Sequence, residues 1–525
     1  MTINKYFFIF VISLLATLQS HAERVDSVQQ NYIIGKSASV TAASAFLGTG
    51  AQSFTMNLPQ IQADLTPTIP GVHKTGVVYQ LPSPVTAMQL PWEPVNGGYV
   101  AHIHLFSDQA KRLRYHLVLS QEISSIEFRI QGSMDASPLG PIDQTFIHDK
   151  TLWLPITNGN KAGLEIFVDD TKSPEALDFS IDAINVIVDD LNSGNIPSIN
   201  TKSLGLAQEQ EFDLACLANS KDYYPALEQA ASATAQIQFI NNGGSFLCTG
   251  TLLNDKGSTH TPWLATANHC ISDQPTANTA SFEWFFQATS CGGSTTDSRY
   301  AQTYGGARLL GTDFNLDASF LRLNKPPPYG ATFSGWDTDI QVGELVWGVH
   351  HPEGDHTMVS KGNVVALLQT IQESGTGRSH LLNTVNYVYG GAEGGSSGSG
   401  LFSVANGSAY WKGTLSGGPE DNYQLNFYSN FKSYYIYIKP WLDNTITLNS
   451  IECLLNWAEN AYSNLFLPAG AISQFQSPYT YRYYRNTNSY VGVSLINNHV
   501  YYLRPDGVLE DVGDLSGWLT TASCQ

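Results

Sequence analysis

Hydrophobic and polar residues alternate in short runs through much of the first half of the chain. Residues 98–107, "GYVAHIHLFS", and 112–120, "RLRYHLVLS", show this alternation, and so do residues 124–132 and 162–170. A period of two is typical of strands that bury one face, and turn residues separate the runs. From residue 76 to about residue 190 the pattern therefore predicts a small antiparallel β-sandwich, in which nothing indicates chemistry.

A second β-rich region follows the polar stretch at 191–212, which predicts a linker. This region runs from residue 213 to about residue 448 and contains most of the glycines. The tail, 451–525, opens with the helix-like "ECLLNWAENAYSNLF" and continues in tyrosine-rich short strands. We interpret these tyrosines as cross-strand pairs in a small sheet; a surface that binds polysaccharide or the cell envelope is the alternative. At 525 residues, the chain is too long for one core.

The first residues carry a different pattern. Lys5 precedes an apolar run from Tyr6 to Leu18, which is shorter than a bilayer span and typical of a signal peptide. Residues 20–22, "SHA", have the small–x–small form that signal peptidase accepts, so we expect cleavage after Ala22. A retained membrane anchor is the alternative. Since no later segment is apolar enough to cross a membrane, we expect an exported protein, secreted or held at the cell surface.

The charge balance excludes two classes of partner. The chain has 45 acidic and 26 basic residues, which gives a net charge of −19 at pH 7. A nucleic-acid binder needs a basic face, and docking on anionic lipid needs basic clusters. We therefore expect neither nucleic acid nor a membrane surface as a partner.

An even number of cysteines in an exported chain suggests disulfides. The six cysteines all follow residue 215 and lack the paired C-x-x-C spacing of a zinc site. They are Cys216, Cys248, Cys270, Cys291, Cys453 and Cys524. Fifteen pairings are open from the count alone. The cysteine-free front half indicates separate modules.

Glycines surround three serines in "YGGAEGGSSGSGLFSV", residues 389–404. Taken alone, such a stretch is more typical of a flexible loop than of a catalytic site. Two other segments change this interpretation. His269 lies in "PWLATANHCIS", where a Cys248–Cys270 bridge would hold it in place. Asp317 leads into the apolar strand of "FNLDASFLRLN", where a buried carboxylate needs a partner.

These three residues make chemical sense as one unit. A serine hydroxyl is a poor nucleophile without a base, and a histidine base needs an orienting carboxylate. Ser397 would then be the nucleophile, and the N–H groups of Gly395 and Ser397 would bind the oxyanion. Gly398 would leave room behind the serine. The alternatives are Asp313 in place of Asp317, or a turn-capping role for Asp317.

Three segments resemble the motifs of chymotrypsin-fold serine proteases. "TANHC" resembles the T-A-A-H-C box, "DASFLRL" the D-x-x-L-L-x-L strand and "GGSSGSG" the G-D-S-G-G-P box. The similarity is closer to the secreted lysyl endopeptidases of bacteria, through "CTGTL", "GSSGSG", "VHHPEGD" and "LSGGPEDNYQ". It covers about residues 216 to 448. The resemblance implies a two-barrel chymotrypsin-like protease domain with His269 as base, Asp317 as its orienter and Ser397 as nucleophile.

The resemblance also implies a specificity pocket. Ser416, Gly417 and Gly418 match the wall of that pocket, and Asp421 matches the aspartate at its base, which pairs with a lysine side chain. Glu420 is a near neighbour, and a solvated loop acid is the alternative for Asp421. Ser416 stands where the family has a histidine, and "NVVALLQT" at 363–370 has no counterpart of the family's active-site tryptophan. Trypsin-like cleavage after Lys or Arg is therefore the safer expectation than strict lysine preference.

The family pairing of cysteines implies disulfides Cys216–Cys291 and Cys248–Cys270, which leaves Cys453–Cys524 for the tail. Such enzymes are made with a long propeptide, so the resemblance implies removal of the front module. Lys202 is the last basic residue before Cys216 and the expected site of self-cleavage. Ser396 replaces an aspartate that pairs with the new N-terminus in many relatives, so maturation is expected to work by uncovering the site.

The sequence therefore predicts a mainly β protein in four parts. These are a signal peptide at 1–22, a β-sandwich-like propeptide at 23–202, a trypsin-like serine protease domain at 203–448 and a small disulfide-closed α+β module at 449–525. The expected function is a secreted, bacterial serine endopeptidase that acts on protein and peptide substrates after Lys, or Arg, without metal or organic cofactor. The alternatives are an inactive protein that kept the protease fold as a binding surface, and a serine esterase.

Overall fold

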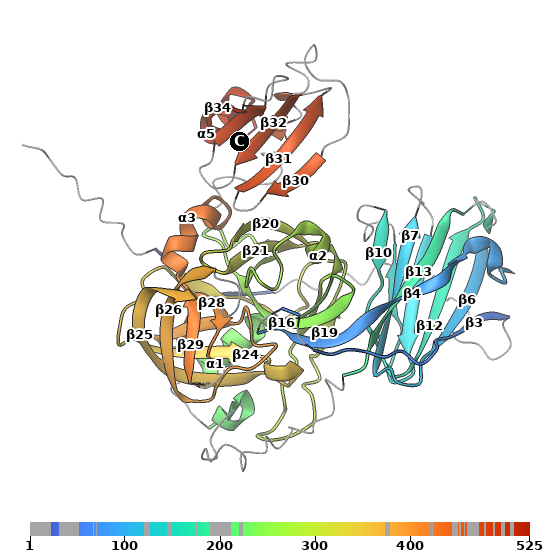
Figure 1. The fold of residues 1–525 in the computed structure, drawn as a ribbon, viewed down its shortest axis with the longest axis horizontal. Coiled ribbons are helices and arrows are strands. Elements are labelled where there is room, and N and C mark those ends of the chain that lie inside the picture. The colour runs from blue at the N-terminus through green and yellow to red at the C-terminus, as the bar shows by residue number, and fades with distance from the viewer. Residues whose placement is uncertain are drawn as a thin grey trace, which may run out of the picture.

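The computed structural model shows three modules along the chain (Figure 1). The residues that it describes are 23–30, 52–66, 68–69, 71–119, 126–143, 146, 150–171, 173–174, 177–189, 212–219, 224–372, 378–419, 422, 424–443, 450, 453–455, 457–458, 472–476, 479–486, 489–494, 499–503 and 509–524. The predicted signal peptide, with Ala22, and residues 191–211 of the predicted linker, with Lys202, lie outside these residues. The described chain is mainly β, as the sequence predicts.

The front module consists of two mainly antiparallel sheets that pack around one core. One sheet has the order β3-β6-β12-β8-β9, with β5 on β6, and the other contains β10-β7-β13-β4, with β11 on β7. Alternate residues such as Ile103, Leu117 and Phe128 are fully buried between the sheets, because a strand sends successive side chains to opposite faces. The strands are β3 Ser53–Asn57, β4 His73–Thr86, β5 Glu93–Val95, β6 Gly98–Phe106, β7 Arg112–Leu119, β8 Ile126–Gly132, β9 Leu139–Ile142, β10 Thr151–Trp153, β11 Thr157–Asn158, β12 Lys161–Asp169 and β13 Phe179–Ile187. The short helix η1 spans Ala87–Gln89.

The central module contains two sets of strands. The first set is joined to the front module, because β4 also pairs with β16. It comprises β15 Thr234–Asn241, β16 Gly244–Leu253, β17 Trp263–Thr266, β18 Ser281–Trp284, β19 Ala301–Thr303, β20 Ala307–Asp313 and β21 Ala318–Leu323. The second set comprises β14 Phe212–Asp213, β22 Thr332–Phe333, β23 Gly335–Asp337, β24 Leu345–His350, β25 Met358–Gln372, β26 Ser379–Tyr389, β27 Gly400–Ala405, β28 Ser408–Gly417 and β29 Leu425–Ser429.

The helices of the central module are short. They are η5 Leu214–Leu217, α1 Tyr224–Ala233, α2 Gln274–Thr279, η6 Pro352–Gly354 and α3 Phe431–Leu442. Helix α3 begins at Asn430, whose side chain caps the N–H of Ser433. Among the described residues, no helix has the length and apolar character needed to cross a membrane.

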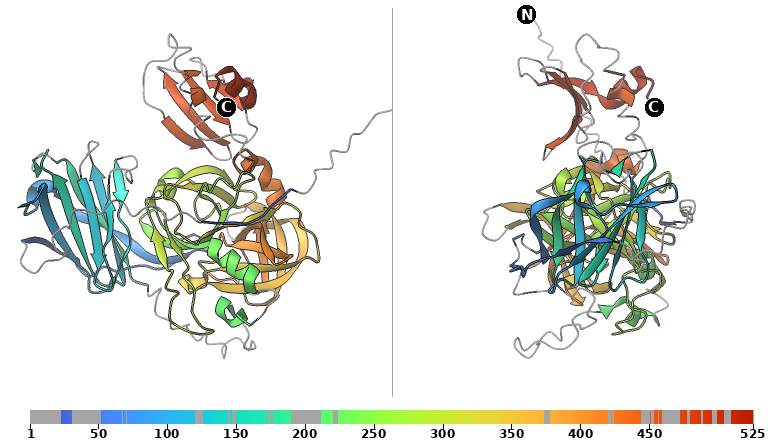
Figure 2. Two further views of the ribbon diagram at one scale, coloured as in Figure 1. Left: turned by 180° about the vertical axis from the view of Figure 1, so that it is seen from behind. Right: turned by 90° about the vertical axis from the view of Figure 1, so that its right-hand side faces the viewer.

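The first described residues belong to the central module rather than to the front one. Strand β1, Arg24–Val25, pairs with β23, and β2, Val28–Gln29, pairs with β22. The backbone N–H of Glu23 also donates to the side chain of Thr338 at 2.9 Å. Figure 2 shows this segment running along the central module. The sequence analysis groups this segment with the propeptide because the segment is short and mostly polar. Its strand partners, which are distant in the sequence, place it in the central module instead.

The tail contains a five-stranded antiparallel sheet in the order β30-β31-β32-β33-β34. Its elements are β30 Ile472–Gln476, β31 Tyr479–Asn486, β32 Ser489–Ser494, β33 His499–Leu503, β34 Leu509–Asp514 and helix α5 Leu515–Thr521. Residues 453–455 and 457–458 are helical, where the sequence predicts a helix. The disulfide Cys453–Cys524 ties this helical part to the end of α5.

Candidate active site

The turn that carries Ser397 lies between β26 and β27. Gly395 and Gly398 both have positive φ angles, 92° and 82°, which residues with a side chain rarely adopt. A Cβ on Gly398 would lie 2.2 Å from Thr266 Oγ1 and 2.4 Å from the carbonyl oxygen of Thr249. These two contacts explain why only glycine fits directly behind the serine.

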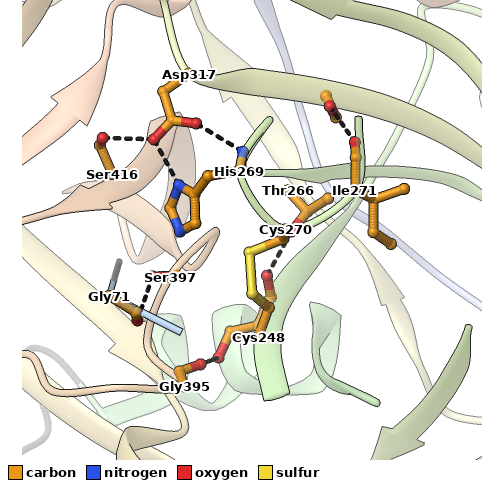
Figure 3. The surroundings of a disulfide bond; sticks show 12 residues. Gly71, Cys248, Thr266, His269, Cys270, Ile271, Asp317, Gly395, Ser397 and Ser416 are labelled. Carbon is orange, nitrogen blue, oxygen red and sulfur yellow. Dashed lines mark hydrogen bonds and ion pairs between the residues drawn. A yellow bond between two sulfur atoms is a disulfide. The ribbon is translucent and has the colours of Figure 1, made fainter. Parts of the chain in front are cut away.

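His269 lies in the turn after β17, beside the disulfide that joins Cys248 in β16 to Cys270 (Figure 3). Among the described residues, Cys248, His269 and Cys270 also form a group whose side-chain ligand atoms lie close enough together to suggest a metal site. Both sulfurs are used by the disulfide, so the group does not provide the thiolates that a zinc ion requires. The disulfide instead anchors the backbone that presents the imidazole.

Asp317 meets His269 through two hydrogen bonds. The backbone N–H of His269 donates to Oδ1 of Asp317 at 3.0 Å, and Nδ1 of the ring lies 2.8 Å from Oδ2. Burial alone would raise the pKa of this carboxyl group, but the charge of His269 and the hydrogen bonds it accepts keep the pKa below its usual value. An ionised carboxylate can only accept, so the proton of a neutral His269 is on Nδ1. Nε2 is then a base.

Asp317 is placed at this point by the turn before β21. Its φ is 46°, in the left-handed region that aspartate tolerates better than most residues. Its N–H donates to the carbonyl oxygen of Phe314 at 3.1 Å, which closes the turn. Asp313, the rival in the sequence, instead accepts from the N–H of Leu316 at 2.9 Å. The structure therefore brings Asp317, and not Asp313, to the histidine.

Ser416 has a role that the sequence did not reveal. Its hydroxyl donates to Oδ2 of Asp317 at 2.5 Å, from the end of β28. The family motif had placed this residue in the wall of the specificity pocket, and its neighbour Gly418 does approach β29, where a Cβ would lie 2.4 Å from the carbonyl oxygen of Leu425. A Cβ on Gly417 would meet nothing within 4 Å. Asp421, and Glu420 beside it, lie outside the described residues.

The hydroxyl of Ser397 points to a residue of the front module. It donates to the carbonyl oxygen of Gly71 at 2.9 Å (Figure 3). Gly71 has a φ of 73°, and a Cβ there would lie 3.4 Å from Ser397 Oγ. Nothing in the residues around Gly71 suggested this contact, because it depends on two segments 326 residues apart.

Strand β4 delivers Gly71 to the serine. Just after Gly71, the strand pairs with β16 in antiparallel register, with His73 opposite Leu247 and Val77 opposite Gly244. A second attachment lies further from the site, where the buried guanidinium of Arg112 forms an ion pair with the buried carboxylate of Glu283. The segment that leads into β4 therefore lies against Ser397 while the front module is attached to the central one.

Three disulfides are present in the described residues: Cys216–Cys291, Cys248–Cys270 and Cys453–Cys524. This is the pairing that the resemblance implies. The first joins η5 to the loop after β18, so two of the three bonds lie in the central module. All six cysteines are used.

Two family models match consecutive parts of the chain. The lysyl endopeptidase N-terminal domain matches residues 67–187, and the lysyl endopeptidase C-terminal domain matches residues 204–435. The lysyl endopeptidase of Pseudomonas aeruginosa is 33% identical over 304 residues, which are 56% of this chain and 63% of that protein. The matched region thus spans less than two thirds of that relative's length.

Solved structures also match less than half of the chain. Deg5 covers 43% of this chain and 97% of its own, at 14% identity and a TM-score of 0.30. The serine endoprotease of Yersinia pestis covers 42% of this chain and 66% of its own, at 14% identity and a TM-score of 0.29. Because the two family models describe one kind of protein and together match more than half of the residues, this chain belongs to the lysyl endopeptidase family.

Proposed function

We propose that this chain is the precursor of a secreted serine endopeptidase that uses His269, Asp317 and Ser397. The observation that carries the proposal is the hydrogen-bonded pair of His269 and the buried Asp317, next to a serine held on a glycine turn. The family membership and the three disulfides support an enzyme that works outside the cell. A chain that had become only a binding module would have no need to keep this orientation.

The geometry supports acyl transfer. Oγ of Ser397 attacks the substrate carbonyl carbon while Nε2 of His269 takes the hydroxyl proton, and the N–H groups of Gly395 and Ser397 stabilise the oxyanion. His269 then gives the proton to the leaving amine as the C–N bond breaks. Water attacks the acyl-enzyme with His269 again as base, which releases the acid and restores Ser397. Asp317 stabilises the imidazolium in both steps.

A fluorophosphonate probe tests this proposal on the processed protein. We expect labelling of the wild-type protein at Ser397, and no labelling of Ser397→Ala. Cleavage of both a lysyl peptide amide and a lysyl ester by the unlabelled, processed enzyme separates an endopeptidase from an esterase, which would cut only the ester. Absence of labelling in folded, processed wild-type protein would favour the binding-module alternative.

For specificity, we propose that Asp421 pairs with the substrate's Lys, or Arg, side chain. Replacing it with asparagine is expected to lower kcat/KM for lysyl substrates by about 10²- to 10⁴-fold, because a buried charge loses its partner. Glu420→Gln is the matched control and should change kcat/KM less than about threefold. Cleavage sites in a digested protein library, read by mass spectrometry, provide the measurement. Cuts that do not follow Lys or Arg would contradict the assignment.

We also propose that the front module keeps the precursor inactive. The oxygen of Gly71, rather than a carbonyl carbon, meets the serine hydroxyl, and Gly71 has no side chain to enter a specificity pocket. Cleavage after Lys202 would then separate the modules. The intact mass of the mature protein checks this step: a start at Ser203 that disappears in Ser397→Ala is expected, and a start far from it, unchanged in the variant, would contradict self-processing.

Release of the front module should depend on pH. The backbone of His73 lies against Gly394, where a Cβ would be 3.4 Å from the Cβ of His73. Burial, together with Glu353 and Asp355, raises the pKa of the adjoining Glu393 to about 7, against the opposing effect of His73. Burial, together with Glu353 and with Asp189 of the front module, raises the pKa of Asp355 to about 6. His73 of the front module lowers the pKa of Glu393, whereas Asp189, which leaves with that module, raises the pKa of Asp355, so the covered form favours a protonated Asp355.

The sign follows from linkage. Because the pKa of Asp355 is raised to about 6 in the complex, this group favours the complex at low pH, and the contribution is lost as the pH rises through about 6. After cleavage of the linker, we expect a larger dissociated fraction at about pH 8 than at about pH 5, measured by size-exclusion chromatography. Asp355→Asn should flatten the dependence. Tighter association at the higher pH would contradict it.

For the tail we propose a disulfide-closed sheet module, whose buried Leu454 and Val493 belong to the same apolar cluster as Trp441 of the central module. A role in binding polysaccharide or the cell envelope is the alternative to a purely structural one. Binding of the wild-type protein to isolated cell envelopes, lost when the chain is ended before Cys453, would favour the binding role.

A further inference from the structure

His350 is a buried histidine that the mechanism above does not use. It ends β24, is 1% exposed, and lies between two serines. Its Nδ1 is 2.7 Å from Oγ of Ser396, the residue before the nucleophile, and its Nε2 is 3.0 Å from Oγ of Ser360 in β25. A polar residue at the buried end of the apolar run "LVWGVH" is the signal that the sequence offered.

The directions of these hydrogen bonds follow from their partners. The hydroxyl of Ser360 donates to the carbonyl oxygen of Gly391 at 2.8 Å, so its oxygen accepts from Nε2–H of His350. Nδ1 of a neutral ring is then an acceptor, and the hydroxyl of Ser396 donates to it. The oxygen of Ser396 in turn accepts the N–H of Glu393 at 3.2 Å. One continuous chain thus joins Glu393 to Gly391 through His350.

This chain of hydrogen bonds contains no charged group. Burial lowers the pKa of His350 to about 3, with a smaller contribution from the neighbouring His351, so the ring is neutral at neutral pH. Each of its two nitrogens has a partner, and each serine both donates and accepts. Fully satisfied buried networks fix one conformation, because breaking any member leaves a costly unpaired group. The network therefore holds the turn 391–396 rigidly.

Two carbonyl groups of the same turn are also fixed by hydrogen bonds. The N–H of Glu353 donates to the carbonyl oxygen of Gly394 at 2.6 Å, and the N–H of Ser399 donates to that of Ser396 at 3.0 Å. A trans peptide is planar, with its C=O and N–H pointing in opposite directions. Holding the carbonyls of Gly394 and Ser396 therefore aims the N–H groups of Gly395 and Ser397 the other way.

We infer that His350 is a positioning residue for the reaction: through Ser396 it holds the turn in the form that aims the N–H groups of Gly395 and Ser397 at the oxyanion. This inference rests on the proposed serine endopeptidase function. The network is complete while Gly71 still covers Ser397. The oxyanion turn is thus assembled before the front module leaves, and activation requires only uncovering of the site.

Two substitutions at His350 separate its two hydrogen bonds. In His350→Asn, the short amide lies where Nδ1 was and its oxygen still accepts from Ser396. In His350→Gln, the longer amide reaches the place of Nε2 and still donates to Ser360, but Ser396 loses its acceptor. Both variants remove the ring and have similar volume, so each controls for the packing loss of the other. Ser396→Ala removes the same bond from the opposite side.

The processed enzyme is assayed on a lysyl peptide, with a lysyl peptide aldehyde as a probe of oxyanion binding. We expect His350→Gln and Ser396→Ala to lower kcat by about 10- to 100-fold, with KM changed less than about twofold. Binding of the aldehyde should weaken by a similar factor. His350→Asn should retain kcat within about threefold, although its thermal midpoint falls as in His350→Gln. A purely structural role would make the two variants alike.

The outcomes separate this inference from the function on which it rests. A wild-type protein that is neither labelled at Ser397 nor active would overturn the proposed function and the inference with it. An active wild type whose Ser396→Ala variant keeps kcat and aldehyde affinity within about twofold would overturn the inference alone. Ser396→Ala removes a single oxygen atom, so it decides the matter even where the His350 variants fail to fold.

Discussion

Replacing Asp317 with asparagine is expected to lower kcat by about 10⁴-fold while the fold remains intact. The carboxylate accepts from the N–H and Nδ1 of His269 and from the hydroxyl of Ser416. An asparagine NH₂ group in the place of Oδ2 cannot accept from Nδ1–H. The ring then adopts the other tautomer, with its proton on Nε2, and cannot take the proton of Ser397.

The matched control is Asp313→Asn. Asp313 lies four residues earlier and caps the N–H of Leu316, a bond that an asparagine oxygen also forms, so we expect less than about a twofold change in kcat. Steady-state kinetics on a lysyl peptide and thermal unfolding of both variants provide the measurements. Comparable losses of kcat in the two variants would show that Asp317 is not the residue that orients His269.

Replacing Gly398 with alanine is expected to destabilise the protein by about 3 to 5 kcal/mol. The new Cβ would meet the carbonyl oxygen of Thr249 at 2.4 Å and Thr266 Oγ1 at 2.2 Å, both within the strands behind the serine. The positive φ adds about 1 to 2 kcal/mol of backbone strain. Because the carbonyl oxygen of Thr249 is a backbone atom, the strand itself must move, and activity should fall with stability.

Gly407→Ala separates the two causes of this loss. Gly407 has a similar φ of 78°, but a Cβ there would meet nothing within 4 Å. Alanine at this hairpin turn should therefore cost only the backbone term, about 1 to 2 kcal/mol. Denaturant unfolding of the two variants measures the difference. Equal losses would show that the close contacts behind Ser397 relax without cost.

The strands of the front module were predictable because their pattern is local. The runs at 98–107, 112–120 and 162–170 became β6, β7 and β12 within a residue or two at each end. The start of the chain was not. The segment 24–29 is short and mostly polar, and it pairs with β22 and β23, which lie about three hundred residues away. Alternation of apolar and polar residues indicates a strand, but it does not identify the neighbouring strand with which that strand pairs.

The candidate site divides in the same way. The sequence identified His269, Asp317 and Ser397 because each lies in a motif whose residue types make chemical sense together. It also indicated why Gly395 and Gly398 must be glycine. It did not separate Asp317 from Asp313 on chemistry alone, and it placed Ser416 only in a pocket wall. The bond from Ser416 to Asp317 depends on the end of β28 reaching the start of β21.

The sequence by itself thus indicated separate modules, the cysteine-rich second half and the three residues of the proposed mechanism, because these depend on local pattern and residue type. Only the tertiary structure decided that Gly71 lies on Ser397, and that His350 is bonded to Ser396. The physical reason is distance along the chain: each contact joins two segments whose sequences do not identify one another, and which come together only because β4 pairs with β16 and β24 pairs with β27.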